Sequence, residues 1–191
     1  MASEGKEKGG RWLRRLRADD PAERRAAERE LFDRFQGPVE RVLRRLLGTD
    51  NEDCVQEALL DVFRGLAAFE GRSKLSTWVF RVTMRRGWKC LAERRARRSQ
   101  ASSGDEFADD LSTPGPTIEE HLDASELARR FKRSLDRLDL QQKSVMALSA
   151  VEDLTPSKIA DILGIPVGTV NSRLHRARQR MRELLDIPEA T

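Results

Sequence analysis

The fold of this chain is decided by residues 155–182, TPSKIADILGIPVGTVNSRLHRARQRMR. Thr155 is a typical helix N-cap, and Pro156 suits the first helical position, where a missing N–H removes no hydrogen bond. Gly164 predicts the end of this first helix, and the Ile-Pro pair after it keeps the chain from continuing in line. Two short helices joined by a glycine turn are typical of a helix-turn-helix.

The second of these helices has an apolar stripe opposite a basic face. The inner positions are Val170, Leu174, Ala177 and Met181. The other faces carry Thr169, Asn171, Ser172, Arg173, His175, Arg176, Gln179 and Arg180. Residues 167–182 contain five arginines and no acid, whereas a solvated surface helix usually mixes both signs. This pattern favours a helix that reads the DNA major groove over a solvated helical hairpin.

Composition predicts an almost wholly helical protein. The chain has 191 residues, 38% hydrophobic and 36% charged, with no tyrosine, and few runs alternate as strands do. Its charges are segregated: residues 50–61 hold five acids and no base, and residues 72–98 hold ten bases and one acid. Residues 99–126 hold eight acids and no base. Such segregation indicates different partners for different segments.

Other features limit the function classes. Cys54 and Cys90 have no metal-like spacing to each other or to His121 and His175, so they are interpreted as buried or half-buried free thiols of a reducing cytosol. No apolar run approaches the roughly 20 residues of a spanning helix, and residues 1–17 lack the apolar segment of a secretory signal. We therefore expect a soluble, cytoplasmic protein without a metal, a cofactor or membrane insertion.

The first part of the chain predicts a helical domain over residues 20–98. Residues 1–19 are expected to form a poorly ordered N-terminal extension, within which a short helix packs Trp12, Leu13 and Leu16. A capping box begins the next helix at Asp20, and Gly37-Pro38 is expected to interrupt it. The apolar stripe then resumes as Val39, Val42, Leu43, Leu46 and Leu47.

An acidic helix is expected from near Asp50. Its buried positions are Val55, Leu59, Val62, Phe63 and Leu66. Its polar side carries Asp53, Gln56 and Glu57. Acids in the first turn are explained by the helix dipole, but Glu57 and Asp61 lie beyond that turn with no basic residue nearby in sequence. The basic surface of a partner would explain them.

A loop, FEGRSKLS (69–76), leads into a long basic helix that begins at Ser76 or Thr77. The side chains expected to face inward are Trp78, Val82, Trp88 and Leu91. Those expected to face outward are Arg81, Arg85, Arg86 and Lys89. Cations can follow phosphates while rings hold unstacked bases, so this helix is interpreted as a nucleic-acid contact, with Trp78 itself interpreted as core packing.

Residues 99–120 have the composition of an acidic flexible linker, including Pro114-Gly115-Pro116. The linker separates the first domain from a second helical domain at residues 121–187. In this second domain, Phe131, Leu135 and Leu138 are expected to form an inner face. The support for the helix-turn-helix is expected from Val145, Met146, Leu148 and Val151.

Four features, in this order, resemble the extracytoplasmic-function (ECF) group of bacterial RNA polymerase sigma factors over about residues 22–185. DCVQEALLDVFRGL (53–66) is similar to the helix that docks on the polymerase clamp. AFEGRSKLSTWVFRV (68–82) resembles the loop and helix that melt and read the promoter −10 element. VEDLTPSKIADILGIPVGTVNSRLHRAR (151–178) resembles the −35-reading helix-turn-helix, and the acidic linker stands where the family threads a connector through the polymerase's RNA path.

The resemblance implies a transcription initiation factor that binds core RNA polymerase and promoter DNA and is held inactive by an anti-sigma factor. It implies no enzymatic activity and no small-molecule substrate. Core-polymerase contacts are assigned to Asp53, Gln56 and Glu57. Contacts to the −10 element are assigned to Arg72, Ser73, Lys74, Trp78, Arg81 and Arg85. Contacts to the −35 element are assigned to Thr169, Asn171, Ser172, Arg173, His175 and Arg176.

The chain departs from the family pattern at Arg85, where the group often has an asparagine, at Ser149, where an arginine is common, and at Pro156, which replaces an aromatic residue. Two other function classes remain as alternatives. A repressor or response-regulator output module would use the helix-turn-helix alone, and leaves the acidic and basic helices of the first domain unexplained. An enzyme would need a metal cluster, a phosphate-binding glycine loop or a nucleophile motif, and the sequence offers none.

Overall fold

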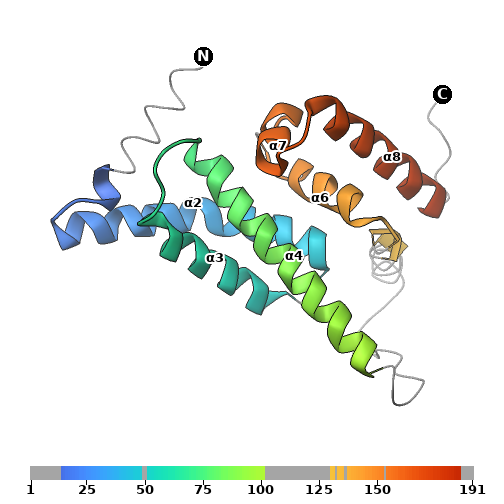
Figure 1. Ribbon diagram of the computed structural model, residues 1–191, viewed down its shortest axis with the longest axis horizontal. Coiled ribbons are helices and arrows are strands. Elements are labelled where there is room, and N and C mark those ends of the chain that lie inside the picture. Colours follow the sequence, from blue (N-terminus) through green and yellow to red (C-terminus); the bar gives the residue numbers. More distant parts are fainter. Residues whose placement is uncertain are drawn as a thin grey trace, which may run out of the picture.

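The computed structural model describes residues 14–48, 51–101, 130–131, 133–135, 137–152 and 154–185, and all the regular secondary structure in these ranges is helical (Figure 1). The predicted all-α class is confirmed. The helices are α2 (Pro21–Leu47), α3 (Glu52–Leu66), α4 (Leu75–Ala101), α6 (Leu140–Ser149), α7 (Pro156–Leu163) and α8 (Val167–Leu185). None of the described helices is long and apolar enough to cross a membrane.

Helices α2, α3 and α4 form the first lobe (Figure 1). The predicted break at Gly37-Pro38 is wrong, because α2 is continuous and Pro38 lies inside it. Proline in a helix interior removes one hydrogen bond and crowds the preceding turn. The buried stripe of α2 continues past Pro38, from Leu31 and Phe35 before it to Val39 after it, and the burial of this stripe stabilises the helix.

The chain before α2 contacts the first lobe. Asp20 caps α2 as predicted, by accepting a hydrogen bond from the Ala22 amide at 2.9 Å, but it does not form the expected capping box with Glu23. Residues 14–16 are helical, and Leu16 packs against the core. Arg17 Nη2 donates to the Phe69 carbonyl at 3.0 Å, which ties this segment to the loop before α4. Trp12 and Leu13 lie outside the described residues.

Helix α4 begins at Leu75, one residue earlier than expected, and its buried face differs from the prediction. Its core residues are Val79, Phe80, Met84 and Cys90. Trp78, Val82 and Leu91 are only partly buried, and Trp88 is exposed. The helix continues through residues 99–101, and the rest of the expected linker, 102–120, lies outside the described residues.

The second lobe contains the predicted helix-turn-helix. A capping box between Asp139 and Gln142 begins α6, and Thr155 caps α7 by accepting from the Lys158 amide at 3.4 Å. Gly164 ends α7 with φ +67°, a left-handed conformation that L side chains rarely adopt. The predicted stripe of α8 is buried in full: Val170, Leu174, Ala177 and Met181. Of the inner face expected before α6, Leu138 is buried and Leu135 partly so, whereas Phe131 is exposed.

The two lobes pack against each other. Helix α6 lies on α2, and α7 lies on α4 (Figure 1). A single apolar cluster reaches from Leu31 in α2 to Leu174 in α8. Polar contacts cross the same boundary, since Trp88 Nε1 donates to Ser144 Oγ at 3.0 Å. The described part of the chain is therefore one closed arrangement of two lobes.

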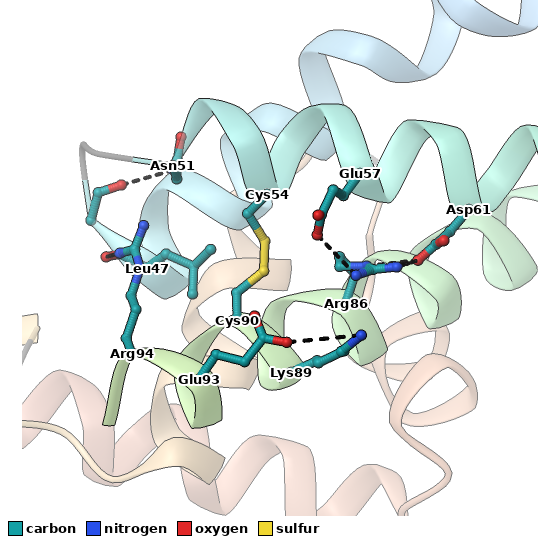
Figure 2. Close-up of a disulfide and its surroundings, with 11 residues drawn as sticks. Leu47, Asn51, Cys54, Glu57, Asp61, Arg86, Lys89, Cys90, Glu93 and Arg94 are labelled. Atoms are coloured by element: carbon teal, nitrogen blue, oxygen red, sulfur yellow. Dashed lines mark hydrogen bonds and ion pairs between the residues drawn. A yellow bond between two sulfur atoms is a disulfide. The ribbon is translucent and has the colours of Figure 1, made fainter. Parts of the chain in front are cut away.

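The cysteine prediction is wrong in one respect. Both cysteines are buried as expected, but they are not free thiols, because Cys54 of α3 and Cys90 of α4 form a disulfide (Figure 2). They are 36 residues apart in sequence, and only the packing of α3 on α4 brings them together.

Candidate nucleic-acid interface

The outward face of α8 carries the residues that the sequence assigns to the −35 element. Asn171, Ser172, His175 and Arg176 are exposed, and Thr169 and Arg173 are half-buried. The opposite stripe of the helix is buried in the lobe, so these side chains point away from the core. A helix held on one side and polar on the other has the shape that a major groove accepts.

Most of the cations of this face have no partner among the described residues. Within the described part of the chain, Arg173, Arg176 and Arg178 make no ion pair or hydrogen bond through their side chains, while Arg180 pairs with Glu183 at 2.9 Å. Ser172 Oγ donates to the Thr169 carbonyl at 3.0 Å, which fixes its hydroxyl in the first part of the helix. Three guanidinium groups are left for an external anion.

The loop before α4 and the start of α4 carry most of the residues assigned to the −10 element. Arg72 pairs with Glu70 at 2.5 Å, Lys74 is exposed, and Ser73 is half-buried. Trp78 packs on Phe69 with a ring-centroid distance of 5.1 Å. A Cβ atom added at Gly65 would lie 2.8 Å from the Trp78 ring, so only glycine lets α3 approach the indole this closely. The interpretation of Trp78 as a packing residue agrees with these contacts.

A cavity of 480 Å³ opens beside this indole, between α3 and α4. Its lining residues are Asp61, Gly65, Ala68, Trp78, Val82, Arg85, Arg86 and Lys89. Arg85 is exposed and makes no side-chain hydrogen bond or ion pair with the described part of the chain. The site therefore combines an aromatic wall with a free guanidinium, a combination that suits an unstacked base.

Arg81 does not belong to this cavity in the closed arrangement. Its Nε and Nη2 atoms both donate to the Asp161 carbonyl of α7, at 3.2 and 2.6 Å. Arg81, although assigned to the −10 element, is therefore hydrogen-bonded to the second lobe. Sequence reasoning did not foresee the contact, because it joins residues 80 positions apart.

The acidic face of α3 exposes Asp53, Gln56 and Glu57, as predicted. Two of the expectations about its charge are wrong. Glu57 and Asp61 do have a basic neighbour, and Arg86 does not face outward: its guanidinium lies between them, 2.9 Å from Glu57 and 2.5 Å from Asp61 (Figure 2). The Arg86 side chain is only 16% exposed.

The ion pairs with Arg86 account for two of the acidic residues of α3, Glu57 and Asp61, without a partner protein. The hydrogen bond that Arg86 donates to Asp61 raises the pKa of Arg86, as do the charges of Asp61, Glu57 and Glu93, whereas partial burial lowers it, and the net shift is upward. Arg86 is therefore charged throughout the accessible pH range. Asp53 and Gln56 make no hydrogen bond or ion pair through their side chains with the described residues and remain open to a partner.

An apolar groove between α2 and α3 was missed by the sequence analysis. It has a volume of 620 Å³, and Phe32 and Leu60 on its walls are 37% and 49% exposed. Gln56 is among its lining residues, so it adjoins the acidic face. The signal was present in the sequence, because Leu60 falls outside the inner stripe of α3 and an apolar residue there has no place in the core.

The described residues contain no group of three or more His, Cys, Asp or Glu side chains placed to hold a metal ion. The surfaces described above present guanidinium groups, amide and hydroxyl donors, an aromatic wall, carboxylates and an apolar groove.

Comparison with known proteins agrees with this geometry. The family model for Sigma-70 region 2 matches residues 31–100, and that for Sigma-70, region 4 matches residues 128–181. The ECF RNA polymerase sigma-E factor of Escherichia coli is 31% identical over 156 residues, which cover 78% of this chain and 81% of that protein. The chain belongs to the ECF RNA polymerase sigma factors.

Other ECF sigma factors align over similar lengths. SigW of Bacillus subtilis is 25% identical over 168 residues, 82% of this chain and 87% of its own length. The sigma-E factor of Haemophilus influenzae is 30% identical over 159 residues, 78% and 82% of the two chains. The predicted function, an ECF sigma factor that acts in transcription initiation, is confirmed.

Two solved structures share the fold of this ECF sigma factor. One is the sigma factor RpoE in complex with the anti-sigma factor NepR from Bartonella quintana, with a TM-score of 0.62 at 24% identity over 84% of this chain and 98% of that one. The other is CnrH in complex with the cytosolic domain of CnrY, with a TM-score of 0.63 at 20% identity over 97% and 99% of the two chains.

Proposed function

We propose that this ECF sigma factor directs core RNA polymerase in the cytoplasm through three separate surfaces and performs no bond chemistry itself. The face of α8 reads the −35 element, the loop and cavity of α4 hold the opened −10 element, and α3 binds the polymerase. The division of labour follows two domains, 20–98 and 121–187, joined by the segment 99–120, whose first three residues continue α4. The observation that carries the proposal is the set of free cations on α8, opposite a stripe buried in full.

For the −35 element, we assign base contacts to Asn171, Ser172, His175 and Arg176, with a supporting contact from Thr169. These side chains are exposed or half-buried on one face of one helix. Arg173 is assigned to phosphate. A guanidinium that binds guanine O6 and N7 together supplies about 1–3 kcal/mol of discrimination, so Arg176 is expected to dominate sequence preference.

For the −10 element, we assign the cavity beside Trp78 to an unpaired base. Arg85 is the free donor there, supported by Arg72, Ser73 and Lys74 of the loop. An asparagine both donates and accepts, whereas an arginine only donates. The base that this chain holds is therefore expected to present acceptors toward Arg85, as guanine does.

For the polymerase, we assign Asp53, Gln56 and Glu57 together with the apolar groove of Phe32 and Leu60. Exposed apolar residues beside unpaired polar groups are typical of a protein interface. The ion pair to Arg86 leaves 53% of the Glu57 side chain exposed, so its carboxylate is also accessible to a partner.

The closed arrangement suggests how this function is held back. Arg81 is engaged by the second lobe, so the lobes must separate before it reaches DNA. An anti-sigma factor that contacts both lobes would stabilise the closed arrangement, and the two solved relatives are both bound to a second protein, in one case an anti-sigma factor. Once open, the sigma factor favours strand opening by binding the opened strand selectively, which shifts an existing equilibrium.

Run-off transcription tests the proposal. Core RNA polymerase with this chain should initiate from promoters of one −35/−10 class, and core polymerase alone should not. A library of randomised −35 and −10 positions identifies that class. DNA binding without any polymerase-dependent initiation would contradict the proposal and leave only a DNA-binding module.

A further inference from the structure

The disulfide joins the two helices of the first lobe to which the proposed function assigns different tasks. Cys54 lies in the first turns of α3, directly after Asp53 and two residues before Gln56. Cys90 lies on α4, beyond Arg85 and Arg86. Figure 2 shows the bond running between the facing sides of these helices. Any change in it acts first on the start of the polymerase-binding helix.

The pair has no alternative partner in the chain. The sequence contains two cysteines and both are in this bond. They are 5% and 8% exposed, so a small thiol or disulfide reaches them only when the start of α3 opens locally. Disulfides in proteins of a reducing cytosol are usually transient and redox-sensing, whereas structural disulfides belong to oxidising compartments. A protein that works with RNA polymerase operates in the first kind of environment.

Neighbouring contacts hold the two helices together without the bond. Arg86 bridges to Glu57 and Asp61 one to two turns further along α3. Two contacts hold the flanking chain: Arg94 Nη1 donates to the Leu47 carbonyl at 3.0 Å, which joins α4 to the end of α2, and Asn51 Nδ2 donates to the Gly48 carbonyl at 2.8 Å just before α3 (Figure 2). The two sulfur atoms therefore stay near each other when reduced, and the bond can form again.

We propose that Cys54 and Cys90 form a redox-responsive disulfide that fixes the start of α3 on α4 and strengthens polymerase binding when it is oxidised. This inference rests on the proposed function of α3. We expect the bond to preorganise the start of α3. It lowers the conformational entropy of the segment that carries Asp53 and Gln56 in the free protein, so less entropy is lost when the polymerase binds.

The chemistry is thiol–disulfide exchange with a low-molecular-weight disulfide such as oxidised glutathione. One cysteine thiolate attacks that disulfide, forms a mixed disulfide and releases one small thiol. The second cysteine then attacks the mixed disulfide, closes the Cys54–Cys90 bond and releases the other small thiol. Two protein thiols lose two electrons and two protons in total, and the small disulfide gains them.

A thiol titration tests the bond without any polymerase. The full-length protein is equilibrated in buffers that run from fully reduced to fully oxidised glutathione, quenched in acid, denatured and treated with a maleimide, and its mass is measured. Denaturation is needed because both sulfur atoms are buried. We expect both thiols to be labelled at the reduced end and neither at the oxidised end. Two free thiols at the oxidised end, or a bond that survives the reduced end, would overturn the proposal.

Binding to core polymerase tests the consequence. The oxidised wild-type protein should bind core enzyme about three- to tenfold more tightly than the reduced protein, the range expected for ordering one or two side chains. The matched control is Cys54→Ser/Cys90→Ser, whose affinity should not change between the two buffers. Equal affinities of oxidised and reduced wild type would overturn the docking effect.

Two further readouts keep the outcomes distinct. Circular dichroism of the reduced wild type confirms that it stays helical, and Cys54→Ala/Cys90→Ala replaces the serine variant if the buried hydroxyls prevent folding. If neither redox form binds core enzyme, the proposed function fails and the docking effect fails with it. The thiol titration decides separately whether the bond itself responds to glutathione.

Discussion

Helices α4 and α8 are both rich in arginine, yet they differ in how much of that charge is available. On α8, Arg173, Arg176 and Arg178 have no side-chain partner within the described residues. On α4, Arg86 is held by two carboxylates and Arg81 by a carbonyl of the other lobe. Arg94 also donates to a backbone carbonyl. The fold therefore engages Arg81, Arg86 and Arg94 of α4 inside the protein and leaves Arg85, Arg95 and Arg97 without a side-chain partner among the described residues.

The difference matters because a cation contributes to nucleic-acid binding only when it is free to neutralise a phosphate and release a counterion. A guanidinium between two carboxylates stabilises the protein and adds little to DNA affinity. Helix α8 is thus suited to binding, whereas the middle of α4 is suited to holding the first lobe together, and its free donors are Arg85, beside the cavity, and Arg95 and Arg97 near its end. The following predictions test this contrast.

The largest effect is expected from Arg176→Ala. Loss of a bidentate guanine contact removes about 1–3 kcal/mol of discrimination, or roughly five- to 150-fold in −35 preference. Run-off transcription on matched and scrambled −35 promoters measures the ratio. The control is Arg180→Ala on the same helix, whose side chain is already paired with Glu183. If both variants kept the wild-type ratio, α8 would not be the reading helix.

A smaller effect is expected from a pair of variants across one ion pair. Glu57→Gln should weaken core-polymerase binding about tenfold and lower the free energy of unfolding by less than about 1 kcal/mol, because the carboxylate is half exposed. Arg86→Gln should do the reverse, with core binding unchanged and about 1–3 kcal/mol of stability lost, because Asp61 and Glu57 lose their shared donor.

Core-binding titrations and urea unfolding separate the two variants of this pair. The interpretation of Glu57 as a polymerase contact fails if Arg86→Gln impairs binding as much as Glu57→Gln does. In that case, the acidic face would act only through the stability of the first lobe.

Salt dependence provides a third test. Arg173→Gln should reduce the slope of log affinity against log salt concentration by about 1, because one phosphate contact is lost. Arg86→Gln should leave the slope unchanged. Promoter affinity of the polymerase complex, measured by fluorescence anisotropy across a salt series, gives both slopes. Equal slopes for Arg173→Gln and wild type would remove the phosphate contact from α8.

The smallest effect is expected at the hydrogen bond between Trp88 of α4 and Ser144 of α6, which joins the two lobes. Trp88→Phe and Ser144→Ala each remove one side of the same hydrogen bond between the lobes. The double-mutant cycle should give a coupling of about 0.5–1.5 kcal/mol. The opening equilibrium, read by energy transfer between dyes on the two lobes, is the measurement. Additive single effects would mean that this bond does not help to close the lobes.

The helix-turn-helix was predictable because its signals are local. Thr155, Pro156 and Gly164 mark the ends of α7 within ten residues, and the stripe from Val170 to Met181 follows the helical period. Each of these features acts on its near neighbours in sequence. The residues assigned to the −35 element lie exposed or half-buried on α8, opposite its buried stripe, and their roles stay predictions.

The first lobe was less predictable because its decisive contacts are distant in sequence. Arg86 meets Glu57 across 29 residues, and Cys54 meets Cys90 across 36. Neither pairing has a local pattern. The helix break predicted at Pro38 is wrong for a related reason, since the burial that keeps α2 intact comes from other helices rather than from α2 itself. The groove at Phe32 and Leu60 likewise needs two helices to exist.

Gly87 of α4 lies where the packing of α4 on α2 leaves no room for a side chain. A Cβ atom at that position would lie 2.5 Å from Leu46 Cδ2 and 2.9 Å from Leu43 Cδ2, so α4 crosses α2 over a bare backbone. Glycine inside a helix costs about 0.5–1 kcal/mol relative to alanine, and the close crossing compensates for that loss. Of the α4 positions, Gly87 should thus tolerate the fewest replacements in a saturation screen, although it touches neither promoter nor polymerase in the proposed mechanism. A position can thus be restricted by the side-chain atoms that it lacks, without contacting any partner of the protein.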